Sequence, residues 1–83
     1  MIPADRIDVT VGEPNWAPLE HVLPLNECMN YMYMGRAGDI ELYKHRHTRR
    51  SLNISRAGDR FYRYSNETYI EITQFAALEH LRS

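Results

Sequence analysis

The sequence predicts an α+β domain: a small antiparallel β-meander of about four to six strands, with a short helix before the sheet and a C-terminal helix packed on one of its faces. Three observations predict this class. Apolar and polar residues alternate with period two around a repeated tetrapeptide, the connections between these segments are short, and the last residues carry the apolar stripe of a helix.

The repeated tetrapeptide is Arg-Ala-Gly-Asp, which occurs at residues 36–39 and 56–59. Glycine accepts a positive φ without steric penalty, and aspartate bonds to nearby backbone amides, so this composition is typical of a turn. Alternating segments flank both copies. The repeat therefore predicts two β-hairpins in series, with Gly38 and Gly58 at equivalent turn positions. Binding of an anion by the backbone amides of each turn is the alternative interpretation.

Residues 25–34 fit two interpretations. Leu25, Cys28, Met29 and Met32 have the i, i+3, i+4, i+7 spacing of an amphipathic helix. The repeat favours a strand over 30–34 instead, because the matching segment of the second copy is rich in residues that prefer strands. We expect a strand at 30–34.

The elements before this region follow from alternation and proline positions. Ile7, Val9 and Val11 alternate with polar residues, which predicts a short first strand ending near Gly12. A short helix is expected over 18–23, since proline suits the first helical turn and a second proline follows the segment.

The elements after it are four further strands and a helix. Thr73 can cap that helix through its hydroxyl, and Phe75, Leu78 and Leu81 form its apolar side. The strands share short connections and period-two patterns. They are expected within residues 39–46, 49–55, 60–65 and 68–72.

The meander also predicts which side chains share a face. Ile40 with Leu42, Leu52 with Ile54, and Ile70 with Ile72 are expected under the C-terminal helix. Tyr62 and Tyr64 are further core candidates. The opposite, more polar face is expected to carry Glu41, Tyr43, His45, Arg49, Ser51, Asn53, Phe61, Arg63, Tyr69 and Glu71.

Length and composition indicate one domain over 1–83, in which residues 1–6 are expected to fray. Cys28 is the only cysteine, and the first 14 residues lack the basic and apolar regions of a signal peptide. No apolar run approaches the roughly 20 residues that span a bilayer. These features predict a cytoplasmic protein without a membrane partner.

Charge is distributed in blocks. Residues 1–43 contain seven acids and two arginines, residues 44–63 contain seven cations and one acid, and residues 64–83 contain three acids and one arginine. Such blocks indicate either an anionic partner or pairing of the middle of the chain with its ends. The candidate residues for binding an anion or partner are Tyr43, Lys44, His45, Arg46, His47, Arg49, Arg50 and Arg63.

Enzyme and metal-protein functions are disfavoured. His45 and His47 can lie on one strand face, and His21, His80 and Cys28 are the other potential ligands, but no recognised zinc spacing accompanies them. No motif joins a nucleophile to a base, and no glycine-rich phosphate loop is present. We expect no catalytic residue, no metal and no cofactor.

The sequence thus predicts a small non-catalytic binding or accessory module. A protein partner or self-association is the first expectation, because the methionines and tyrosines of residues 28–34 and open sheet edges are hard to cover in a thin domain. Binding of nucleic acid or another polyanion through the basic hairpin 43–63 is the alternative, with Tyr43, Phe61 and Tyr69 as stacking surfaces. A small enzyme or metal protein is the third.

Overall fold

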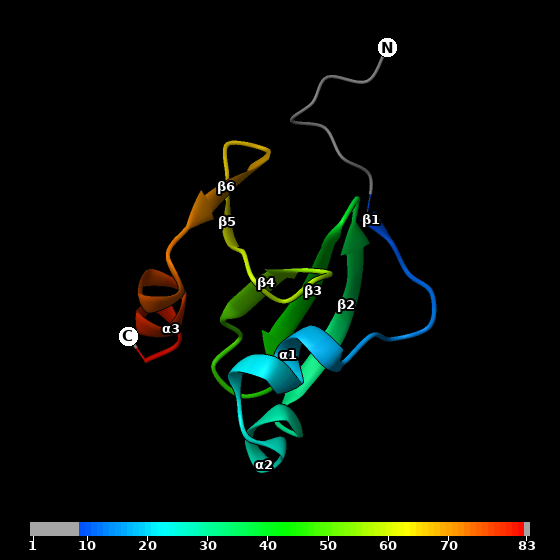
Figure 1. Cartoon of the computed structure of the whole chain (residues 1–83), viewed down its shortest axis with the longest axis vertical. Coiled ribbons are helices and arrows are strands. Elements are labelled where there is room, and N and C mark those ends of the chain that lie inside the picture. The colour runs from blue at the N-terminus through cyan, green and yellow to red at the C-terminus, as the bar shows by residue number, and fades with distance from the viewer. Residues whose placement is uncertain (1–8, 83) are drawn as a thin grey trace.

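A computed structural model describes residues 9–82 and confirms the α+β meander. Six antiparallel strands follow one another in sequence order, and three helices accompany them (Figure 1). The elements are β1 (Val9–Thr10), α1 (Ala17–Val22), α2 (Leu25–Cys28), β2 (Tyr31–Ala37), β3 (Ile40–His45), β4 (Ser51–Ser55), β5 (Phe61–Ser65), β6 (Thr68–Ile72) and α3 (Gln74–Arg82). Residues 1–6 and Ile7, for which fraying and a strand position are predicted, lie outside the described range.

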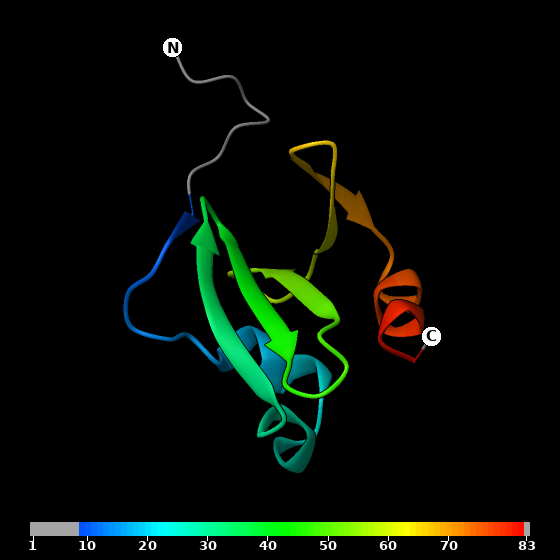
Figure 2. The same ribbon diagram turned by 180° about the vertical axis from the view of Figure 1, so that it is seen from behind.

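The helices lie on one face of the sheet. Leu19 of α1, Cys28 of α2 and Ala77 of α3 all belong to the main core. This core also contains five side chains from the strands. Figure 1 shows α1 in front of β2 and β3, and Figure 2 shows those strands uncovered from behind. The strand side chains of the main core are Tyr31, Tyr43, Leu52, Ile54 and Phe61.

The ambiguous region 25–34 divides into a helix and a strand. The helical stripe holds for Leu25–Cys28, and the predicted strand is confirmed from Tyr31 onwards. Gly35 has φ 112°, and the register of β2 against β3 shifts between Tyr33 and Gly35. This irregularity is a β-bulge, which a glycine with positive φ accommodates.

Both Arg-Ala-Gly-Asp copies lie at hairpin turns, but the two turns differ. In the first, Ala37 pairs directly with Ile40, which leaves a two-residue loop. In the second, the last cross-strand pair is Ile54 with Phe61, so the loop is longer. The expectation of two superposable turns is therefore wrong in detail, although Gly38 and Gly58 both have positive φ. The repeated tetrapeptide thus predicts where the two turns lie, but it does not predict how long each loop is.

The buried hydroxyl of Ser55 closes the longer loop. It accepts hydrogen bonds from the backbone N–H groups of Asp59 at 3.2 Å and Arg60 at 3.0 Å, and it lies 2.9 Å from the Asp59 carboxylate. The Arg56 N–H also donates to the Asp39 carbonyl at 2.8 Å. The two turns therefore lie side by side.

The predicted face of β3 is wrong. Tyr43 pairs with Leu52 and Glu41 pairs with Ile54, so Glu41 and Tyr43 point into the main core. Ile40 and Leu42 point to the other face, where they form a small cluster with Ala37, covered by Tyr62 and Tyr69. Alternation separates two sets of residues, but cross-strand register decides which set faces the helices.

The predicted positions of two aromatic residues of β5 are also wrong. Phe61, expected on the polar face, is 4% exposed in the main core, and Tyr64, expected to be a core residue, is 58% exposed. Tyr69 of β6 packs against the cluster formed by β2 and β3, so the sheet is strongly curled. The predicted cap of α3 is confirmed, since the Ala76 N–H donates to Thr73 Oγ1 at 3.0 Å.

Candidate functional site

The end of β3 and the β3–β4 loop together hold six of the eight predicted binding residues. Lys44 and His45 are the last two residues of β3, and the loop comprises residues 46–50. His45 Nδ1 accepts hydrogen bonds from the backbone N–H groups of His47 at 3.1 Å and Thr48 at 3.2 Å. Arg49 adopts φ 65°. The His45 side chain and the left-handed backbone conformation of Arg49 therefore fix the conformation of the loop.

A second contact ties this loop to the start of β2. The Arg46 N–H donates to the carbonyl of Asn30 at 2.8 Å, and the Tyr31 ring lies 5.1 Å from the His45 ring, edge to face. The side chains of Arg46, His47 and Arg49 remain exposed. The loop thus presents cations from a defined backbone.

Tyr43 does not belong to this exposed set, which corrects its prediction as a binding residue. Its side chain is fully buried, with its ring 5.8 Å from that of Trp16, and its hydroxyl donates to the carbonyl of Asn15. Burial, together with the nearby Glu41 carboxylate, raises the pKa of Tyr43. Tyr43 is a core residue that anchors the segment before α1.

Arg63 also lies apart from the loop. It extends from β5, where it pairs with Ile70 of β6, and lines a cleft of about 600 Å³ between β4, β5 and α3. Only two residue pairs join β4 to β5, which lets the strands diverge at this cleft. The structure therefore brings together Lys44, His45, Arg46, His47, Arg49 and Arg50 but not Tyr43 or Arg63.

The ion pairs among the described residues involve other arginines. Glu41 contacts Arg36 at 3.3 Å and Arg56 at 3.5 Å, and Arg56 also lies 4.0 Å from Asp39. Within residues 9–82, no acid forms an ion pair with Lys44, Arg46, Arg49 or Arg50. Within the basic block of residues 44–63, Arg56 therefore pairs with acids of the same chain. The cations of residues 44–50 have no such ion pair among the described residues and can interact with an external anion.

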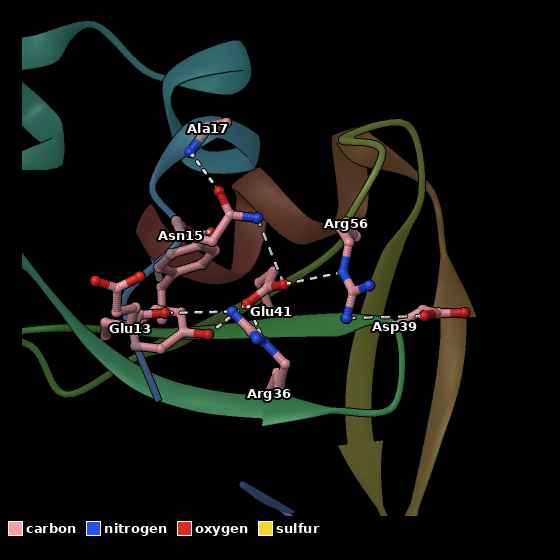
Figure 3. Close-up of polar contacts among 9 residues, drawn as sticks. Glu13, Asn15, Ala17, Arg36, Asp39, Glu41 and Arg56 are labelled. Atoms are coloured by element: carbon pink, nitrogen blue, oxygen red, sulfur yellow. Dashed lines mark hydrogen bonds and ion pairs between the residues drawn. The ribbon is translucent and has the colours of Figure 1, made fainter. Parts of the chain in front are cut away.

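Glu41 is a further residue that sequence reasoning misplaced, and it is fully buried. Figure 3 shows Asn15, Arg36 and Arg56 directed toward it. Its carboxylate accepts hydrogen bonds from the Tyr33 hydroxyl at 2.5 Å, Arg36 Nε at 3.3 Å and Asn15 Nδ2 at 3.5 Å. Burial by itself would raise the pKa of Glu41, but these bonds outweigh it and lower the pKa. Arg36 also donates to the Glu13 carbonyl at 3.3 Å.

This network joins four segments of the chain around one buried charge. Asn15 lies before α1, Tyr33 and Arg36 on β2, and Arg56 in the β4–β5 loop. The arrangement holds the segment 13–16 against the sheet and leaves the carboxylate saturated with donors. The sequence signal for this network is the arginine at the start of each tetrapeptide, because Arg36 and Arg56 both contact Glu41.

An apolar groove lies beside the basic loop. It encloses about 350 Å³ and is lined by residues of α1, α2, β2 and the loop. Leu25 and Met29 are 68% and 71% exposed. The lining residues are Trp16, Glu20, Leu25, Cys28, Met29, Tyr31 and Arg46.

The outer edge of β6 is unpaired among the described residues. The β5–β6 loop consists of Asn66 and Glu67, both with positive φ, as in a type I′ turn. In such a hairpin the pair closing the turn is hydrogen-bonded, and bonded and non-bonded pairs then alternate. Tyr69 and Glu71 therefore direct their N–H and C=O groups away from β5.

The catalytic and metal alternatives gain no support from side-chain geometry. In the described part of the chain, no three His, Cys, Asp or Glu residues gather as a metal site. His45 and His47 lie with rings 5.7 Å apart, but no described acid or cysteine joins them. Burial, and then the neighbouring Glu20, raise the pKa of the Cys28 thiol, which makes it a poor nucleophile.

Among residues 9–82 no helix is both long and apolar enough to cross a membrane. Comparison of the chain with protein-family models, with curated proteins and with solved structures finds no match.

Proposed function

We propose that this protein is a non-catalytic binding module whose partner is a protein, and that it associates with a second copy of itself through β6. The observation that carries the proposal is the edge of β6 that no other strand of residues 9–82 covers, which presents the N–H and C=O groups of Tyr69 and Glu71. An unpaired strand edge is a ready template for another strand.

The sequence of β6 is self-complementary in one antiparallel register. If Ile70 lies opposite its own copy on a two-fold axis, Tyr69 lies opposite Glu71 of the second copy. Both residues direct their backbone groups outwards, so this pair exchanges hydrogen bonds, and the Ile70 pair is the closely spaced one between them. No like charges meet, and Ile70, which is 37% exposed, gains apolar contact.

Sedimentation velocity over increasing protein concentration tests this proposal. The wild type is expected to sediment faster as concentration rises into the hundreds of micromolar. Ile70→Lys is expected to sediment as a monomer, because two ammonium groups would meet on the axis. Glu71→Pro removes an outward N–H that no described strand pairs with, and it should also abolish association.

Val11→Lys is the matched control, because Val11 is 78% exposed and lies outside β6. It should associate like the wild type. A wild type that remains monomeric throughout, or an Ile70→Lys variant that associates equally well, would contradict the proposal.

A second candidate function is binding of a polyanion by the β3–β4 loop. Its support is the group of exposed cations that no described acid neutralises. Of the three predicted stacking rings, Tyr43 and Phe61 are buried, so contact through phosphate groups is favoured over stacking of bases. Arg49→Ala with Arg50→Ala should weaken retention of single-stranded DNA, and retention should fall steeply with salt. No retention at low salt would remove this candidate.

A further inference from the structure

The groove beside α2 combines exposed apolar side chains with a single cation. Leu25 and Met29 lie one turn apart on α2 and its C-terminal flank, and both are more than two-thirds exposed. Unbranched methionine adapts its shape to different contacts, which suits a surface that receives another side chain. The volume of about 350 Å³ lies near the lower end of the usual range for ligand pockets.

Arg46 supplies the cation, and its backbone is held in place from two sides. Its N–H donates to the Asn30 carbonyl, and the turn that follows is closed on His45 Nδ1. No described acid forms an ion pair with Arg46. A guanidinium presented in this way can bind a carboxylate through two parallel hydrogen bonds.

We propose that this groove binds a short segment of a partner protein that carries a large apolar side chain with a carboxylate close beside it. The apolar side chain contacts Leu25 and Met29, and the carboxylate pairs with Arg46. Arg49 and Arg50 on the same loop add a favourable field for further acidic residues of that segment.

Glu20 distinguishes a peptide from a nucleic acid as the occupant. It lines the same groove, so a continuous chain of phosphates would meet a negative charge there. A peptide can place one carboxylate at Arg46 and a neutral or cationic group at Glu20. Charge complementarity therefore favours an acidic, apolar-anchored peptide.

This inference uses a different face from the β6 edge, and it deepens the protein-binding role proposed above without requiring self-association. The two proposals can fail separately. Ile70→Lys, which is expected to prevent association, should leave peptide binding at the groove unchanged.

Selection from a displayed library of random twelve-residue peptides against the full chain tests the groove. Enriched peptides are expected to carry Leu, Ile, Met, Phe or Trp within about four residues of Asp or Glu, a spacing that one helical turn brings to a single face. Arg46→Glu should weaken binding of a synthesised, enriched peptide at least tenfold, and Met29→Ser should weaken it severalfold. Arg60→Glu and Val11→Ser are the matched controls, since both residues are exposed and lie outside the groove.

Four outcomes would overturn the proposal. They are no enrichment, enrichment of peptides without acids, enriched peptides that bind Arg46→Glu as well as the wild type, and single-stranded DNA that binds through Arg46 while no peptide does. Circular dichroism of each variant checks that the fold persists. If Met29→Ser unfolds, Leu25→Ser replaces it, because Leu25 lies on the same rim.

Discussion

Replacement of Glu41 by Gln should destabilise the fold, because Glu41 is the buried charge on which Tyr33, Arg36 and Arg56 converge. Gln keeps the shape of Glu, but it removes the charge and replaces one acceptor oxygen with a donor. Hydrogen bonds to charged groups contribute about 1.5–3 kcal/mol. Arg36 and Arg56 are 31% and 55% exposed and can turn to water, so we expect a net loss of about 2 kcal/mol.

For a domain of this size, that loss corresponds to a fall in Tm of roughly 8–16 °C. Thermal unfolding followed by circular dichroism at neutral pH measures it. Glu79→Gln is the control, because Glu79 is exposed on α3 and forms no ion pair with a described residue. That change should alter the free energy of unfolding by less than about 0.5 kcal/mol.

The pH dependence gives a second readout of the same residue. The pKa of Glu41 is lowered in the folded state, so its contribution is present above the pKa of the unfolded chain, about 4.3, and is lost as the pH falls through the lower folded pKa. The stability difference between wild type and Glu41→Gln should therefore shrink below about pH 4. An unchanged Tm at neutral pH, or a difference that does not vary with pH, would refute this reasoning.

Three further substitutions test local features of the fold. Gly35→Ala should lower the free energy of unfolding by about 2 kcal/mol, because φ is 112° and the new Cβ would lie 2.6 Å from the Thr10 carbonyl oxygen. Urea denaturation measures this loss, with Gly12→Ala as the control because its new Cβ meets nothing within 4 Å. Equal denaturation midpoints for the two variants would argue against the bulge. Thr73→Ala should cost about 1 kcal/mol by removing the cap of α3, whereas Thr73→Ser should retain most of it, and identical melting curves for the two variants would show that the cap is unimportant. Glu67→Gly should stabilise the protein by about 1 kcal/mol, because Glu67 has φ 63° and glycine adopts that conformation without strain. The Tm of this variant measures the gain, and a Tm below that of the wild type would contradict the type I′ turn.

The order of the strands and the positions of α1 and α3 could be predicted from local patterns, because turn chemistry and alternation are properties of neighbouring residues. The separate helix α2 was not part of the predicted fold, because the pattern of residues 25–34 fitted both a helix and a strand. Gly38, Gly58 and Thr73 have the conformations or contacts that their residue types indicate. Faces could not be predicted in the same way. β3 carries Ile40 and Leu42 on one face and Tyr43 on the other, so its apolar residues do not reveal which side meets the helices.

The grouping of some candidate residues follows from the sequence alone. The cations of 44–50 lie together because they are close in sequence, at the end of β3 and in the loop that follows it, and no long-range information is needed to group them. The burial of Tyr43, the separation of Arg63 and the convergence of Arg36 and Arg56 on Glu41 all depend on cross-strand register and on the curl of the sheet. The groove joins Trp16, Met29 and Arg46 from distant segments and has no local signature.

Hydrogen exchange of the β6 amides, measured by NMR at low and high protein concentration, tests the proposed self-association most directly. In the monomer the N–H groups of Thr68, Ile70 and Ile72 bond to β5, while those of Tyr69 and Glu71 face solvent. Our account predicts that Tyr69 and Glu71 exchange fast in dilute solution and become protected as concentration rises, and that they stay unprotected in Ile70→Lys. Fast exchange of these two amides at every concentration, or protection that Ile70→Lys does not remove, would contradict it.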